Sequence, residues 1–136
     1  MNLKRLVFSS ALLAGVVFGS VCNTNASPVT YTNYQLYAYC DNNYTNTHSK
    51  QTTTQSIRNT VTSFTSTDKA NFWSVGVVNG TAVRISSVHS QIVGSTCDLS
   101  FDQGYYIPKF GIVQMGMENG YNVNYSALVS GTVDFR

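Results

Sequence analysis

The sequence predicts an all-β domain, an antiparallel β-sandwich of about seven or eight short strands, with a small β-barrel as the alternative. Three observations lead to this prediction. Short runs of alternating apolar and polar residues fill the second half of the chain, two Asn-Gly pairs separate such runs, and few segments have the periodicity of a helix. The expected β-sandwich domain is a single domain comprising residues 27–136, and residues 1–26 form a leader.

The composition argues against intrinsic disorder and against nucleic-acid binding. The 136 residues are 43% hydrophobic and 12% aromatic, which is too apolar for a disordered chain and suits one folded domain. Only 10% are charged and the formal net charge is +2, so the basic surface that nucleic-acid binding requires is missing.

The first 26 residues have the pattern of a secretory signal peptide. Lys4 and Arg5 precede an uncharged apolar run at 6–21, which is shorter than the roughly 20 residues of a membrane-spanning helix. Small residues favour cleavage after Ala26, and the bulky residue before Cys22 argues against lipoprotein processing. We therefore expect an exported protein, secreted or periplasmic, whose mature chain has no transmembrane segment. Because the leader holds two of the eight basic residues, the remaining chain is neutral, with six basic and six acidic residues.

The first part of the expected domain has an ambiguous pattern. Residues 34–40 alternate as a strand that places Tyr37 and Tyr39 on one face. A polar stretch follows at 41–71. Its most prominent apolar residues are Ile57, Val61 and Phe64. Their spacing of four and three fits one helical face, but the surrounding threonines are poor helix formers, so we expect a short helix or an irregular strand.

The second part has clearer strands. They are expected at 73–78, 81–86, 88–93, 97–102, 110–117, 121–126 and 128–135. Asn79-Gly80 suits the positive φ values of a type I′ turn and predicts a hairpin between the first two strands. Asn119-Gly120 predicts a second hairpin in the same way, and Gly131 in the last strand predicts a β-bulge.

Two cysteines of the expected domain, Cys40 and Cys97, predict one disulfide, because paired cysteines in an exported domain are normally oxidised. The bond would close a loop of 56 residues and stabilise the fold by about 4 kcal/mol in the chain-entropy model. Zinc needs three or four ligands. The chain adds only His48 and His89, without paired spacing, so we expect no metal and no cofactor.

No set of residues predicts a catalytic site. Ser90 follows His89, but adjacent strand residues point to opposite faces and no Gly-x-Ser-x-Gly motif is present. Asp98 and Asp102 lie four residues apart on one strand, about 13 Å, which is too far for the carboxylate pair of a glycoside hydrolase. These two aspartates are followed by Gly104, but their spacing differs from that of the ligands in a calcium-binding EF-hand loop. The sequence therefore favours a binding protein over an enzyme.

Tyrosine is the most informative surplus in the chain. All nine tyrosines and the single tryptophan belong to residues 27–136. A tyrosine ring combines a large apolar face with a hydrogen-bonding tip and loses little entropy on ordering. The candidate binding residues are Tyr37, Tyr39, Tyr44, Tyr105 and Tyr106. The alternative is that these rings pack within the sheets, where tyrosine is common.

Together these features predict an exported binding or interaction module that recognises a glycan or a protein surface. A secreted enzyme inhibitor or a toxin-like effector is the alternative, because a disulfide-stabilised domain can present a rigid loop to an enzyme cleft. A small secreted hydrolase is the third possibility.

Overall fold

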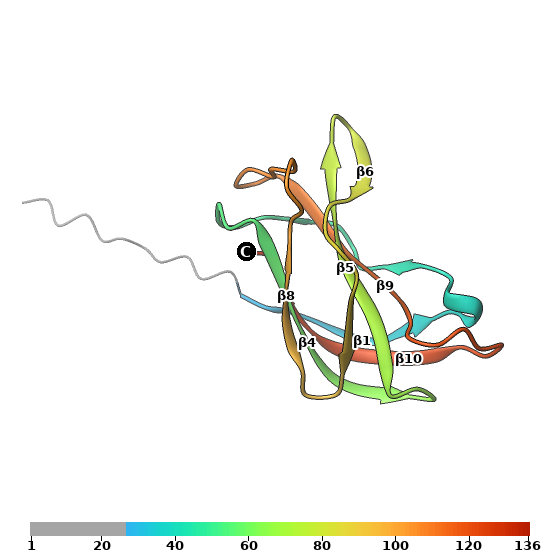
Figure 1. Cartoon of the computed structure of the whole chain (residues 1–136). Helices are drawn as coiled ribbons and strands as arrows, with labels where there is room; N and C mark the ends of the chain where they lie inside the picture. Colours follow the sequence, from blue (N-terminus) through green and yellow to red (C-terminus); the bar gives the residue numbers. More distant parts are fainter. Residues whose placement is uncertain (1–26) are drawn as a thin grey trace, which may run out of the picture.

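The structure is a computed structural model that describes residues 27–136, so the predicted signal peptide lies outside the described residues. It contains ten strands and one 3₁₀ helix in two antiparallel sheets, which confirms the predicted all-β fold (Figure 1). The elements are β1 (Val29–Leu36), η1 (Ala38–Cys40), β2 (Asn43–Tyr44), β3 (His48–Ser49), β4 (Ser56–Thr65), β5 (Lys69–Val78), β6 (Thr81–Arg84), β7 (His89–Ile92), β8 (Thr96–Ser100), β9 (Ile112–Asn119) and β10 (Ala127–Asp134).

The two sheets are built from strands that are distant in sequence. The four-stranded sheet has the order β1-β10-β4-β8. The six-stranded sheet has the order β2-β9-β5-β6, with β3 also pairing with β9 and β7 also pairing with β5. Strands β5 and β9 are therefore central in the second sheet, and β9 turns Val113, Met115 and Met117 toward the core.

Strand β4 resolves the ambiguous segment around Ile57, and the helix alternative for it is wrong. The inward positions of the strand include Ile57, Asn59 and Val61, so a polar residue interrupts the apolar alternation. Its partner β10 pairs Ser130 with Ser63 but Gly131 with Val61, which leaves Thr62 as an extra residue. This β-bulge explains the spacing of three to the next apolar residue, and it shows that a bulged strand can mimic helical periodicity.

One of the two predicted hairpins is present. Strands β5 and β6 pair through Val78 and Thr81, and Asn79 and Gly80 between them have φ values of 50° and 79°, as a type I′ turn requires. The second predicted hairpin is wrong. After Asn119 the chain forms no strand at 121–126 and passes to β10 in the other sheet.

The predicted strand at 34–40 is too long. Strand β1 ends at Leu36, and Tyr39 and Cys40 in η1 have left-handed backbone conformations with φ of 60° and 54°. Tyr39 N donates a hydrogen bond to Val123 O (2.7 Å), so η1 is joined to the β9–β10 connection. Because the strand ends first, Tyr37 and Tyr39 do not share a strand face.

The core lies between the sheets and contains a polar network that joins three strands. Apolar side chains such as Phe72, Met115 and Leu99 form a single buried cluster. Across it, Tyr31 Oη donates to Asn59 Oδ1 (2.9 Å), and Asn59 Nδ2 donates to the Oε1 of Gln91 (2.8 Å). The network therefore links β1, β4 and β7, and burial raises the pKa of Tyr31.

Candidate functional site

A second buried cluster lies on the outer face of the six-stranded sheet, away from the core. Successive residues of a strand point to opposite faces. On β5, Phe72 belongs to the core, so Trp73 and Val75 face outward, and neither is part of the core cluster. Trp73 is nevertheless only 4% exposed. A large aromatic residue on the face turned away from the core can be buried only if other side chains on that face pack around it.

The sheet register places three short rows of side chains on this outer face. The aromatic row runs across β2, β9 and β5, because Tyr44 pairs with Gly116 and Gly116 pairs with Trp73. Next to it lies a polar row, in which Glu118 pairs with Asn71 and Asn71 with Ser90. On the other side lies an Arg-containing row: Gln114, Val75 and Arg84 pair across β9, β5 and β6.

Gly116 makes the aromatic row possible. A Cβ atom at this position would lie 2.2 Å from the Cε2 and Nε1 atoms of Trp73, so the indole lies across β9 where any other residue would collide with it. The indole in turn contacts Tyr44 edge to face, with ring centroids 6.2 Å apart and planes at 86°. Edge-to-face packing is favourable for aromatic pairs, and it places the Tyr44 ring nearly perpendicular to the indole of Trp73.

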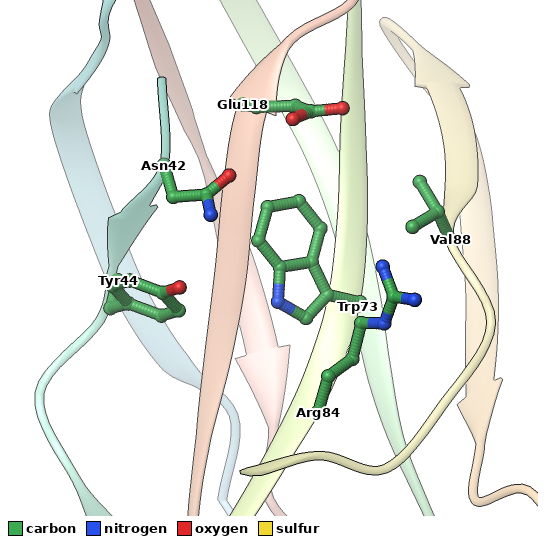
Figure 2. Close-up of a pocket in the computed structure, with 6 residues that line it drawn as sticks. All are labelled: Asn42, Tyr44, Trp73, Arg84, Val88 and Glu118. Carbon is green, nitrogen blue, oxygen red and sulfur yellow. The ribbon is translucent and has the colours of Figure 1, made fainter. Parts of the chain in front are cut away.

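A pocket of about 370 Å³ opens above the aromatic row. Its lining residues are Asn42, Tyr44, Trp73, Arg84, Val88 and Glu118 (Figure 2). Figure 2 shows the indole in the middle, with Glu118 and Arg84 on opposite sides of it and Val88 across from Tyr44. The volume lies within the range of pockets that bind small ligands.

One polar group of the pocket, the Glu118 carboxylate, is oriented by its neighbours. Ser90 Oγ donates to Asn71 Oδ1, and Asn71 Nδ2 donates to Glu118 Oε1 (2.8 Å), which fixes the carboxylate. The pocket therefore offers an apolar ring, one carboxylate acceptor and one guanidinium donor.

The structure does not bring the five predicted tyrosines together. Tyr44 lines the pocket and is 41% exposed. Tyr37 and Tyr39 lie at η1, whereas Tyr105 and Tyr106 lie in the β8–β9 loop. Figure 1 shows η1 and this loop at opposite ends of the molecule. Only Tyr44 belongs to the candidate site.

The predicted disulfide is wrong, because Cys40 and Cys97 are both free thiols in the described part of the chain. Cys40 follows β1 and Cys97 lies on β8, and these strands are opposite edges of the four-stranded sheet. Two strands, β10 and β4, lie between these edges, whereas a disulfide needs Cα atoms within about 7 Å. Cys97 Sγ instead lies 3.5 Å from His89 Nδ1, and burial raises the pKa of the thiol.

The acidic residues weighed as catalytic or calcium ligands have structural partners. Asp98 forms an exposed ion pair with Arg58 (Nε to Oδ1, 2.7 Å), and the hydrogen bonds from the guanidinium lower the pKa of Asp98. Asp102 accepts hydrogen bonds from the backbone N–H and the hydroxyl of Ser87. Among residues 27–136 no three His, Cys, Asp or Glu side chains are grouped so that they could hold a metal ion.

Sequence reasoning missed most of the pocket. Trp73, Arg84 and Glu118 come from three strands, and nothing local in the sequence connects them. The one available signal was Gly116, a glycine inside an apolar strand, since such a glycine often marks the close approach of another group.

Comparison of the chain with models of known protein families and with curated protein sequences finds no match. Residues 27–136 include no helix that is both long enough and apolar enough to cross a membrane. The chemistry of the pocket therefore carries the functional interpretation.

Proposed function

We propose that the protein is a binding module that recognises a saccharide in the pocket above Trp73. The observation that carries this proposal is the aromatic row on the outer face of the sheet, where the exposed Tyr44 ring and the Trp73 indole lie among polar side chains that line one pocket. The signal-peptide pattern at 1–26 supports an exported protein, so the ligand would be met outside the cytoplasm.

A sugar ring fits the mixture of groups in the pocket. It has an apolar C–H face, which an aromatic ring can contact, and a rim of hydroxyl groups that both donate and accept hydrogen bonds. Tyr44 offers the exposed ring face. Glu118 accepts and Arg84 donates, while the amide of Asn42 can do both.

The charges favour a neutral ligand. Glu118 and Arg84 give the pocket one negative and one positive group, and residues 27–136 carry six basic and six acidic residues. A strongly charged ligand would gain little from long-range attraction to such a surface. Hydrogen bonds to charged side chains are nevertheless stronger than those between neutral groups, which suits recognition of hydroxyls.

The single tryptophan makes a direct binding experiment possible. Because Trp73 is the only tryptophan in the sequence, its fluorescence reports on the pocket alone. We expect titration with a panel of neutral oligosaccharides to change this fluorescence in a saturable way for at least one member. Tyr44→Ala and Glu118→Gln should each weaken that binding at least tenfold, whereas Tyr106→Ala, an exposed tyrosine that does not line the pocket, should leave it unchanged.

Two results would contradict the proposal. The first is that no oligosaccharide changes the fluorescence of the folded protein. The second is that a sugar binds equally well to the wild type and to Tyr44→Ala, because that sugar would then bind elsewhere. Capture of a protein partner that depends on Tyr44 would assign the pocket to protein recognition instead.

A further inference from the structure

The β8–β9 loop displays apolar side chains that the pocket does not use. Tyr106 and Phe110 are 65% and 66% exposed, and Tyr105 is also exposed. We call the segment Tyr105–Phe110 the loop tip. A cluster of exposed aromatic residues on one short segment is unusual for a surface that contacts only water.

The loop tip is held rigidly by its base. Ile107 is buried against β5, where a Cβ at Gly76 would lie 2.8 Å from its Cδ1 atom. The side chain of Gln55 bonds both backbone groups of Ile107, since Oε1 accepts from N (2.9 Å) and Nε2 donates to O (3.0 Å). The neighbouring aromatic side chains are therefore presented to solvent by a fixed loop.

Phe110 is held outward by a backbone conformation that is unfavourable for phenylalanine. Its φ is 68°, in the left-handed region, and Gly111 N donates to Pro108 O (2.9 Å) to close a tight turn around it. Glycine or asparagine is the usual residue at such a position, and a bulky side chain there costs about 1–2 kcal/mol. Strain of this kind at an exposed aromatic residue points to a role in binding.

We infer that the loop tip inserts its aromatic side chains into the interface of an anionic lipid bilayer. The exposed ring surface is roughly 350 Å², taking about 200 Å² for each aromatic side chain. A stable protein interface needs about 800 Å² on each partner, so the tip alone is too small for one. A bilayer interface has no such requirement, and tyrosine, phenylalanine and lysine are residues that favour it.

The charge of the loop tip selects the kind of bilayer. Lys109 lies with its Nζ atom 5.0 Å from the Phe110 ring centroid, so the cation and the ring project together. The one carboxylate of the 101–111 loop, Asp102, is engaged by Ser87 at the base. The projecting part of the loop is therefore positive, which complements anionic headgroups. This surface lies at the end of the molecule opposite η1 (Figure 1).

The test is sedimentation with lipid vesicles, using the purified protein with its leader removed. We expect binding to vesicles of phosphatidylcholine with phosphatidylglycerol, weaker binding to phosphatidylcholine alone, and a decrease with added salt. Phe110→Asn should reduce binding at least tenfold while leaving the fold at least as stable, because asparagine tolerates the left-handed conformation. Lys109→Gln should reduce binding to the anionic vesicles about fivefold.

Tyr39→Asn is the matched control. Tyr39 is 70% exposed and also has a left-handed backbone, with φ of 60°, but it lies in η1. Its replacement should leave vesicle binding unchanged. The inference is overturned if the wild type binds neither kind of vesicle, or if Tyr39→Asn weakens binding as much as Phe110→Asn. A protein partner that is lost with Phe110→Asn, without any vesicle binding, would also overturn it.

Discussion

Replacing Gly116 by alanine is the most demanding test of the aromatic row. In the wild-type protein the indole of Trp73 occupies the space beside Gly116, and a Cβ there would lie 2.2 Å from two indole atoms and 2.7 Å from a third. Ordinary contacts between carbon atoms are about 3.5–4.0 Å. The indole must therefore move by more than 1 Å, or the strands must separate.

Gly116→Ala should destabilise the wild-type protein but stabilise a variant that lacks the indole. Overpacking of this kind destabilises a protein by about 1–3 kcal/mol, which lowers the melting temperature of a domain of this size by about 4–12 °C. In a Trp73→Val background the obstacle is gone. There the same Gly116→Ala change should stabilise the strand by about 0.5–1 kcal/mol, because glycine is unfavourable in a strand interior. The sign of the effect should thus reverse between the two backgrounds.

Thermal unfolding followed by circular dichroism measures both effects, and tryptophan fluorescence adds a structural readout. A displaced indole is more exposed to water, so its emission should shift to longer wavelength in Gly116→Ala. A control on the outer face of the same strand, Gln114→Ala, should leave the emission unchanged. If Gly116→Ala has the same effect on stability with and without Trp73, the two residues are not coupled and the described packing is incorrect.

Three further predictions follow from the interior. Burial, together with the positive charge of Arg136 nearby, lowers the pKa of Lys50 from 10.5 to about 8. Between these two pH values the unfolded chain binds more protons than the folded protein, so the free energy of unfolding should rise by about 1.5 kcal/mol from pH 8 to about 9.5. Urea unfolding measures this rise, and Lys50→Met should abolish it. Asn59→Ala removes the acceptor of the Tyr31 hydroxyl and the donor to Gln91 Oε1 and should cost about 2 kcal/mol or more, whereas Tyr31→Phe should cost about 1 kcal/mol in the same assay. Burial raises the pKa of the Cys97 thiol, so its alkylation at neutral pH should be slower in the folded protein than in the unfolded protein. Mass spectrometry measures both rates, and equal rates would contradict the placement of Cys97.

Local signals in the sequence predicted the fold class well. The hairpin at Asn79-Gly80 depends on two adjacent residues that favour positive φ, and a pattern of that kind is visible without knowledge of the rest of the chain. The same dipeptide at 119–120 failed as a hairpin signal. Gly120 N instead donates to Lys69 O (3.1 Å), and the chain crosses to the other sheet. Turn propensity alone does not determine which strand comes next.

The candidate site could not be predicted because it depends on register. Tyr44, Trp73 and Gly116 meet only because β2 and β5 pair with the same residue of β9, and the three positions are far apart in the sequence. The predicted tyrosine face at Tyr37 and Tyr39 failed for a local reason, since the left-handed residues of η1 end the strand pattern. Both errors come from backbone geometry that residue composition does not encode.

The alternation of β5 has a consequence for how this protein could change. Phe72 and Trp73 are neighbours in the chain, yet one contributes to the core and the other to the pocket. Substitutions at the rim of the pocket, at Tyr44, Arg84 or Glu118, therefore leave the packing between the sheets untouched. Selection, in nature or in a combinatorial library, can vary the side chains at these positions while one unchanged interior keeps every variant foldable.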